Sequence, residues 1–291
     1  MIIVKLIGGL GNQMFQYAAG RNLAIKNNTI LKLDISGFKD YKLRNYDLSH
    51  FNIQENIATP KDLSGVIFPL DRFTHKVRKH VFIKLYGIQR IHYIKQHTLN
   101  HQPEILDLGD NIYLDGSWQS EKYFSNIKDV IEKEFTVKNQ PDPINDSWIE
   151  KITQCQSISV HIRRGDYISD PKTSQFHGVL GLRYYRQAMN LMLEKIESPH
   201  FFVFSDDPDW AEKNIRVDAP ITYVKHNDIR NYEDMRLMST CKHHIIANSS
   251  FSWWGAWLAP NENKIVIGPS RWFRGVDYND QDRMPENWLR I

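Results

Sequence analysis

The stretch Ser157-Ile-Ser-Val-His-Ile-Arg-Arg-Gly-Asp-Tyr167 decides the expected fold of the second half of the chain. Its alternating residues predict a strand, because side chains along a strand point to opposite faces of a sheet. The isoleucines and the valine then face one side, while Ser159, His161 and Arg163 face the other. The strand is expected to end near Arg163, with two arginines and a glycine at its carboxyl end.

Apolar runs of the same kind recur on both sides of this strand, with helical patterns between them. They cover residues 201–204, 221–224, 244–247 and 264–267 in the second half, and 2–7, 30–33 and 112–114 in the first. Helices are expected over 12–25, 184–196 and 231–239. This alternation predicts an α/β protein with parallel sheets, because parallel strands need crossover helices between them.

The length of 291 residues suits about two domains. The polar segment 138–147 contains two prolines and no regular periodicity, so it is interpreted as a linker. The predicted organisation is two Rossmann-like domains, residues 1–150 and 151–291, facing a cleft.

The composition excludes several classes of protein. A net charge of +3 with 41% hydrophobic residues excludes a disordered chain, a collagen and a coiled coil. The two cysteines, Cys155 and Cys241, form neither a disulfide framework nor a zinc-type spacing. No apolar run approaches the ~18 residues of a spanning helix. The protein is therefore expected to be cytoplasmic, at most peripheral at the inner membrane.

Residues 72–103 form a basic segment, with seven Lys or Arg residues and no Asp or Glu. Apolar residues are interleaved with the charges, so the segment is either a solvated helix face or a contact for anionic lipid or an acidic partner.

The arginines that end the first quoted strand suit a phosphate or diphosphate. Guanidinium groups bond such oxygens in pairs, and Gly165 would allow close backbone approach. Open α/β sheets bind ligands at this edge. The structural alternative is that an ion pair between an arginine and Asp166 holds a turn.

The stretch Asn248-Ser-Ser-Phe-Ser-Trp-Trp-Gly-Ala-Trp-Leu258 follows another predicted strand. Asn248, Ser249 and Ser250 are all of the helix-capping type, and a helix amino terminus offers free N–H groups to an anion. The alternative is ordinary capping of a helix whose tryptophans fill the core.

The glycine-rich turn Gly8-Gly-Leu-Gly-Asn-Gln-Met-Phe-Gln-Tyr-Ala18 joins the first strand to a helix. Met14 stands where a dinucleotide fingerprint needs its third glycine, and the lysine of a P-loop is missing. Gly11 still permits close approach of a ligand. Asn12 and Gln13 are expected to bring amide groups to the mouth of the cleft, although Asn12 could instead cap the helix.

One acidic pair and one histidine pair are candidate metal ligands. Asp207-Pro208-Asp209 follows a buried strand and either binds a divalent cation with a diphosphate or caps a helix. The helix-capping interpretation is favoured because the arginines already supply positive charge. His243 and His244 lack a third ligand at metal spacing. No metal site is predicted.

Together, the glycine-rich turn, the strand ending in His161-Ile-Arg-Arg-Gly-Asp-Tyr167 and the Asn248 segment resemble the motifs of the α-1,2-fucosyltransferases, glycosyltransferase family 11. The resemblance covers both halves of the chain in the family's order. It implies a GT-B-like fold, GDP-β-L-fucose as donor, inversion at the anomeric carbon, no metal requirement, and a galactose 2-hydroxyl as acceptor. Animal members carry a membrane anchor, and its absence suggests a bacterial-type enzyme.

The resemblance also implies roles for individual residues. Arg163 is expected to contact the β-phosphate, Asp234 the guanine edge, and Asn12 the region of the fucose. The catalytic set is thus Arg163, Asn12 and Asp166, with Asp166, Asp34 and Asp115 as candidate bases. The expected donor-binding residues are His161, Arg163, Arg164, Asp234, Asn248, Ser249, Ser250, Phe251 and Gly11.

Two other functions remain as alternatives. An NAD-dependent oxidoreductase would use the glycine-rich turn, with Asp34 as the acid that binds the ribose. A non-enzymatic carbohydrate-binding protein would use the eight tryptophans to stack on sugars. The acceptor glycan itself is left open: a lipid-linked O-antigen unit, a capsule unit or a free oligosaccharide.

Overall fold

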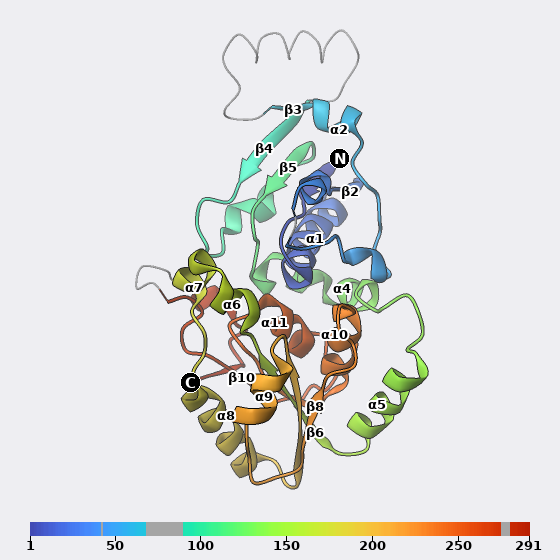
Figure 1. Ribbon diagram of the computed structural model, residues 1–291. Helices are drawn as coiled ribbons and strands as arrows, with labels where there is room; N and C mark the ends of the chain where they lie inside the picture. Colours follow the sequence, from blue (N-terminus) through green and yellow to red (C-terminus); the bar gives the residue numbers. More distant parts are fainter. Residues whose placement is uncertain (42, 68–89, 275–279) are drawn as a thin grey trace. The chain divides into compact units, whose positions relative to one another are not determined.

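The computed structural model describes residues 1–41, 43–67, 90–274 and 280–291. The chain divides into two compact units, Met1–Phe135 and Thr136–Ile291 (Figure 1). Across the described ranges, every helix is too short or too polar to cross a bilayer. Most of the basic segment, residues 72–89, lies outside the described residues.

The first unit is built on a five-stranded parallel sheet in the order β2-β1-β5-β4-β3. Its strands are β1 (Ile2–Lys5), β2 (Leu31–Asp34), β3 (Val66–Ile67), β4 (Ile91–Lys95) and β5 (Ile112–Asp115). Its helices include α1 (Leu10–Lys26), α2 (Pro60–Ser64) and α4 (Lys128–Glu134). The predicted strands β1, β2 and β5 are confirmed. Strands β3 and β4 were missed, because β3 is two residues long and β4 mixes apolar with basic side chains.

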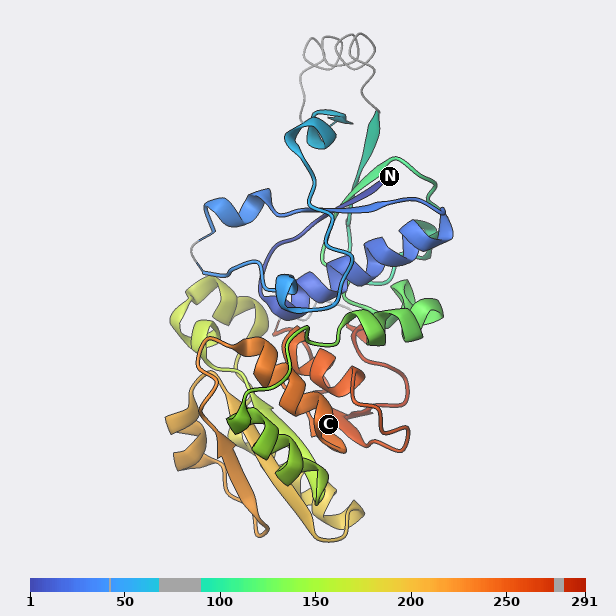
Figure 2. The same cartoon turned by 90° about the vertical axis from the view of Figure 1, so that its right-hand side faces the viewer.

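Helix α1 lies against this sheet (Figure 2), and its contact with the strands is closest at Gly20. A Cβ atom built there would lie 2.9 Å from Cδ1 of Leu31 and 3.2 Å from Cβ of Val4. Both neighbours are buried on adjacent strands. The glycine therefore sets how closely the helix approaches β1 and β2.

The second unit has a six-stranded parallel sheet in the order β11-β10-β9-β6-β7-β8. Its strands are β6 (Gln156–Ile162), β7 (Pro199–Ser205), β8 (Ile221–Val224), β9 (His243–Ile245), β10 (Val266–Gly268) and β11 (Leu289–Arg290). Numbered within the unit, this is the doubly wound order 3-2-1-4-5-6 read from the other edge. All of the strands predicted for this half are confirmed, and among the described residues of this unit only the short β11 was missed.

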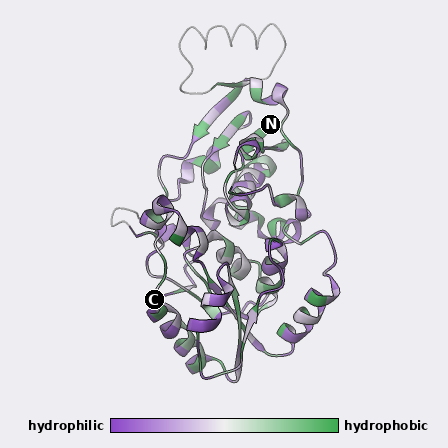
Figure 3. Cartoon of the chain, in the orientation of Figure 1, coloured by the Kyte–Doolittle hydropathy of each residue, from purple (hydrophilic) through white to green (hydrophobic). Residues whose placement is uncertain are grey.

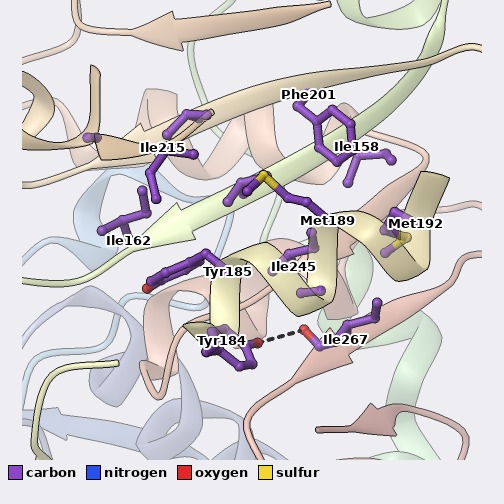
Figure 4. Close-up of a cluster of buried hydrophobic side chains, with 14 residues drawn as sticks. Ile158, Ile162, Tyr184, Tyr185, Met189, Met192, Phe201, Ile215, Ile245 and Ile267 are labelled. Atoms are coloured by element: carbon purple, nitrogen blue, oxygen red, sulfur yellow. Dashed lines mark hydrogen bonds between the residues drawn. The ribbon is translucent and has the colours of Figure 1, made fainter. Parts of the chain in front are cut away.

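Helices cover both faces of the second sheet. They are α5 (Pro143–Thr153), α6 (Gly165–Ser169), α7 (Pro171–His177), α8 (Leu182–Lys195), α9 (Pro208–Asn214), α10 (Asn231–Thr240) and α11 (Ser250–Trp257). Helix α8 packs on the face that carries Ile158, Val160 and Ile162. Figure 4 shows Ile158 and Ile162 beside residues of this helix. Helices α5 and α10 pack on the opposite face. The hydropathy colouring shows both apolar and polar residues along α5 and α8 (Figure 3), as expected for helices with one buried side.

Helix α5 explains why the second unit begins at Thr136, before the predicted domain boundary after residue 150. The polar segment 138–147 was interpreted as a linker. Residues from Pro143 onward instead begin α5, with Asp142 as N-cap and the proline at the first helical position. Ile152 of this helix is buried against the second sheet, so α5 belongs to the second unit.

The order of the strands fixes the place where each sheet can bind a ligand. From β6 to β8, each new strand is added on one side of β6. Strands β9 to β11 are added on its other side, so the strand order reverses between β6 and β9 although all strands are parallel. Ligands of open parallel sheets bind at the carboxyl ends of the two strands that flank such a reversal. In this unit those ends are the Arg163 segment and the Asn248 segment.

Replacement of Gly20 by alanine is expected to destabilise the protein. Alanine favours a helix over glycine by about 1 kcal/mol. The crowded Cβ would nevertheless push α1 away from the strands, and overpacking costs about 1–3 kcal/mol. The urea midpoint of unfolding, followed by circular dichroism, should fall for Gly20→Ala. It should stay nearly constant for Gly109→Ala, whose Cβ would meet no atom within 4 Å.

Candidate active site

Arg163 follows the last residue of β6 and is held by two carboxylates. The register pairs Ile162 with Ser205, so the next residues along the two strands, Arg163 and Asp206, are neighbours. Nη1 of Arg163 lies 2.9 Å from Oδ2 of Asp206, and Nη2 lies 2.5 Å from Oδ1 of Asp166. The guanidinium also lies over the ring of Tyr167, 5.4 Å from its centroid. The guanidinium is therefore fixed in position at the carboxyl end of the strand.

The predicted ion pair with Asp166 is thus present, and it does not exclude the anion-site interpretation. The side chain of Arg163 is 20% exposed. A guanidinium has five N–H donors, more than two carboxylate contacts require.

Arg164, which is also predicted to bind the donor, has two partners within the second unit. Its guanidinium lies 3.7 Å from the ring centroid of Trp210, and Nε donates to Oδ2 of Asp207 at 3.0 Å. Both partners belong to the start of α9. Arg164 therefore joins the end of β6 to α9, which engages the side chain that was expected to bind the donor.

Gly165 is needed for a reason that the sequence did not reveal. A Cβ atom at this position would lie 2.7 Å from Oδ2 of Asp206. The same carboxylate accepts the backbone N–H of Arg164 at 2.8 Å. The close approach that glycine permits is thus that of the Asp206 side chain, which in turn holds Arg163.

His161 lies on the strand just before Arg163 and is buried. Burial and the neighbouring Arg163 charge lower its pKa to about 3, so the imidazole is neutral near pH 7. Its Nδ1 has no hydrogen-bond partner within the part of the chain that the structure describes. The ring lies 5.5 Å from that of Phe251, so His161 is a neutral polar group between Arg163 and α11.

Helix α11 begins beside this arginine. Ser249 is the N-cap, and its hydroxyl accepts the backbone N–H of Phe251 at 3.3 Å. Ser250 is the first helical residue. The Tyr167 hydroxyl donates to the backbone carbonyl of Asn248 at 2.9 Å. The structure thus brings Arg163, His161 and the 248–251 segment together at the reversal of strand order.

The amide nitrogen of Asn248 connects three backbone segments. Its Nδ2 donates to the carbonyls of His177, Gly178 and Trp272, at 3.0, 3.2 and 3.3 Å. These bonds fasten the end of α7 and the segment after β10 to the start of α11. The amide oxygen of Asn248 is buried and has no hydrogen-bond partner among the described residues.

Asp234 lies on α10, which packs against α11. Its Oδ1 accepts Nδ2 of Asn227 at 2.8 Å. Loss of hydration raises the pKa of Asp234 to about 6, although the bond from Asn227 and the charge of Arg230 act in the opposite direction. The carboxylate is therefore ionised at neutral pH and can accept donors from a ligand.

In the first unit, the glycine-rich turn brings Asn12 beside Gln119. Gly8 has a φ of +86°, and a Cβ there would lie 2.6 Å from Nδ2 of Asn12. Oδ1 of Asn12 accepts Nε2 of Gln119 at 2.7 Å. The N-cap of α1 is Gly9, so Asn12 is not the cap. Gly11 is buried in the first turn of the helix.

Gln13 was predicted to present its amide group to a ligand, but its side chain is not exposed. It is fully buried, and its Nε2 donates to the carbonyls of Gly8 and Asn45 at 2.9 and 2.8 Å. Its Oε1 accepts the N–H of Asp47 at 2.9 Å. The amide group of Gln13 stabilises the turn.

The other candidate bases accept bonds from tyrosines. Asp34 is buried and accepts the Tyr113 hydroxyl at 2.6 Å. Asp115 accepts the Tyr93 hydroxyl at 2.5 Å and Nζ of Lys5 at 3.1 Å. Burial and the Asp115 carboxylate raise the pKa of Tyr93 to about 12, so this hydroxyl donates across the neutral range.

Of the acidic pair after β7, Asp207 caps a helix, as the helix-capping interpretation predicted. Asp207 is the N-cap of α9 and accepts the N–H of Trp210 at 3.3 Å, while Asp209 pairs with Lys225. Among the residues that the structure describes, no group of three or more His, Cys, Asp or Glu side chains is arranged to hold a metal ion.

Three residues at these sites were missed by the sequence analysis: Asp206, Asn227 and Gln119. Asp206 had a visible signal, since it follows a buried strand just as Arg163 does. Asn227 and Gln119 lie in loops and reach their partners only through the fold, so nothing in the local sequence marked them.

Comparison with known proteins places this geometry in context. Residues 70–291 match the model described as Glycosyl transferase family 11. An alpha-1,2-colitosyltransferase from Escherichia coli is 36% identical over 100% of this chain and 99% of that protein. Galactoside alpha-(1,2)-fucosyltransferase 1 from Gorilla gorilla gorilla is 29% identical over 65% of this chain and 55% of that protein.

Among solved structures, the chain resembles the α-1,6-fucosyltransferase NodZ from Bradyrhizobium, in crystals soaked with GDP-fucose. The TM-score is 0.51 at 15% identity, covering 89% of this chain and 92% of that one. The likeness confirms the predicted GT-B-like α/β fold with two parallel-sheet domains.

The raised pKa of Asp234 predicts a stabilising substitution. The folded protein binds this proton more tightly than the unfolded chain, so the contribution favours folding at low pH and is lost as the pH rises through about 6. Asp234→Asn should therefore raise the free energy of unfolding at pH 8 by about 1–3 kcal/mol, which is measured as a higher melting temperature. The gain should vanish near pH 4. Asp218→Asn, at an exposed carboxylate, serves as control; an equal gain at both pH values would contradict the assignment.

Proposed function

Because the chain belongs to glycosyltransferase family 11, as its motifs predicted, we propose that it transfers L-fucose from GDP-β-L-fucose to the 2-hydroxyl of a terminal galactose, with inversion. The observation that carries the proposal is the meeting of Arg163 with the amino terminus of α11 at the reversal of strand order. Such a site suits a sugar nucleotide because both groups favour a diphosphate. The dehydrogenase and carbohydrate-binding alternatives do not explain why Arg163 is held at this position.

The donor diphosphate is proposed to lie between Arg163 and the start of α11. Cleavage of the bond between C1 of fucose and the β-phosphate oxygen leaves negative charge on that phosphate. The guanidinium, together with the positive end of the α11 helix dipole at Ser249, Ser250 and Phe251, would stabilise this charge. The phosphate would bond N–H donors of Arg163 other than those that contact Asp166 and Asp206. These carboxylates then act by holding the arginine in position.

The acceptor hydroxyl attacks C1 from the opposite side. As its oxygen bonds to C1, the proton passes to an active-site carboxylate, for which Asp166, Asp34 and Asp115 are the candidates. Asn12 is proposed to orient this hydroxyl, because its amide is held in a fixed direction by Gln119. His161 is neutral, and would contribute a hydrogen bond but no charge.

GDP-colitose is a second candidate donor, favoured by the identity of 36% with the colitosyltransferase along the whole chain. Colitose is the 3-deoxy analogue of L-fucose. A site that bonds the 3-hydroxyl would reject colitose strongly, whereas an apolar site would accept both sugars. The two donors share the nucleotide, so the diphosphate and guanine contacts proposed here serve either one.

We further propose that no metal ion is needed, because the protein supplies the positive groups that a diphosphate requires. The enzyme is proposed to act in the cytoplasm, where segment 72–103 would contact an anionic membrane surface through its basic charges.

The direct test is GDP release from GDP-fucose in excess EDTA, with and without lactose or N-acetyllactosamine. The expected result is release stimulated by the acceptor, with the new linkage at the galactose 2-hydroxyl by NMR. GDP-colitose in parallel decides between the donors by its kcat/KM. Release that requires added Mn²⁺ would refute metal independence, and absence of GDP binding would refute the nucleotide assignment.

Arg163→Lys should lose turnover by about 10²–10³-fold, because one ammonium cannot reproduce the paired bonds of a guanidinium. The measurement is kcat at saturating donor and acceptor. Arg186→Lys, on the exposed side of α8, is the matched control and should retain full activity. Near-normal turnover of the Arg163 variant would remove this residue from the proposed mechanism.

A further inference from the structure

Two buried amide side chains connect Asp234 to the start of the second unit. Asn145 on α5 is fully buried, and Asn227, in the loop between β8 and α10, is 2% exposed. Nδ2 of Asn145 lies 3.0 Å from Oδ1 of Asn227, and Nδ2 of Asn227 lies 2.8 Å from Oδ1 of Asp234. A buried amide is costly unless its polar atoms are bonded. The amide nitrogen and oxygen of both residues have partners, so the orientation of each amide group is fixed.

The direction of these bonds is fixed by Asp142 at the far end. Its carboxylate accepts from Nδ2 of Asn145 at 3.2 Å and from the backbone N–H of the same residue at 2.8 Å. A carboxylate can only accept, so Asn145 must turn its amide nitrogen toward Asp142 and Asn227. Its oxygen then accepts from Nε2 of His226 at 3.0 Å. Asn227 must in turn present its oxygen to Asn145 and its nitrogen to Asp234.

Charged groups surround this chain of hydrogen bonds from Asp142 through Asn145 and Asn227 to Asp234, which we call the relay, and they stabilise the same arrangement. Arg230 is ion-paired with Asp142 and also bonds Oδ1 of Asn227 at 3.4 Å. Glu233 is paired with Arg236, so the charged groups Arg230 and Glu233 beside Asp234 both have partners of their own. The Arg230 charge lowers the pKa of Asp234, whereas burial and Glu233 raise it.

The remaining oxygen of Asp234, Oδ2, accepts no hydrogen bond from the described residues. With Oδ1 anchored by Asn227, the plane of the carboxylate cannot rotate freely. A guanine presents two parallel donors, N1–H and N2–H, to a carboxylate held in this way. Adenine presents an acceptor at N1 instead, which the carboxylate would repel.

We propose that Asn227, oriented by Asn145, is a positioning residue that sets the preference of the donor site for guanine. It anchors the Asp234 carboxylate and stabilises its ionised form, so that both guanine donors are met at neutral pH. The inference rests on the proposed function, since it assumes that Asp234 contacts the base. It adds two residues from outside the sequence motifs to the determinants of specificity.

The test measures dissociation constants of GDP and IDP by calorimetry from pH 5 to 8. IDP lacks the N2 amino group and so loses one of the two donors. The wild-type protein should prefer GDP by roughly tenfold or more, since a hydrogen bond to a charged group is lost. GDP affinity should decline below about pH 6, where Asp234 takes up a proton.

Asn227→Ala should move this pH midpoint upward and reduce the preference for GDP several-fold, while Asn145→Ala should do the same to a smaller extent. Asn261→Ala, which removes the bond to the Lys242 carbonyl and the bond from the backbone N–H of Asn263, is the matched control and should change neither quantity. Should Asn227→Ala fail to fold, Asn227→Ser and the NMR titration of Asp234 in Asn145→Ala report the same shift.

The outcomes separate the two hypotheses. If Asp234→Ala leaves the GDP to IDP ratio unchanged, the guanine contact of the proposed function is wrong. If Asp234→Ala abolishes the preference and Asn227→Ala moves neither the ratio nor the midpoint, the positioning role alone is wrong. A uniform loss of affinity for both nucleotides at every pH in Asn227→Ala would indicate a purely structural role, and would also overturn the inference.

Discussion

The ion pair between Arg163 and Asp206 is the interaction on which the rest of the candidate site depends. It joins the carboxyl ends of β6 and β7, and it requires a glycine at position 165 because the carboxylate occupies the space of a Cβ. Asp166 and Tyr167 then complete the setting of the guanidinium, and the hydroxyl of Tyr167 ties it to the start of α11. One strand register thus brings together a cation and a helix amino terminus.

The fold of the second unit could be predicted well because its signals are local. Buried parallel strands are continuous apolar runs, and the runs ending at Ile162 and Phe204 are unmistakable in the sequence. The prediction was weaker where the chain is short or polar. Strand β4 carries histidine and lysine, so it lacks a continuous apolar run. The segment before Ser147 resembles a linker because proline and polar residues are common both in linkers and at the start of a helix.

The sequence indicates candidate residue types for the site, but it does not indicate their hydrogen-bond partners. Asn248 and Gln13 carry amides that suit a ligand, yet both are used to fasten backbone segments. Arg164 suits a phosphate, yet it stacks on Trp210. Partners are set by register and by helix packing, which join residues far apart in the chain. For the same reason the relay from Asn145 to Asp234 cannot be read from either segment alone.

The central claim is that the donor diphosphate binds between Arg163 and the amino terminus of α11. A crystal structure of the protein with GDP tests it most directly. The account predicts β-phosphate oxygens within hydrogen-bond distance of the Arg163 guanidinium and of backbone N–H groups near Ser250. A diphosphate bound elsewhere, with Arg163 still paired to both Asp166 and Asp206, would contradict the account.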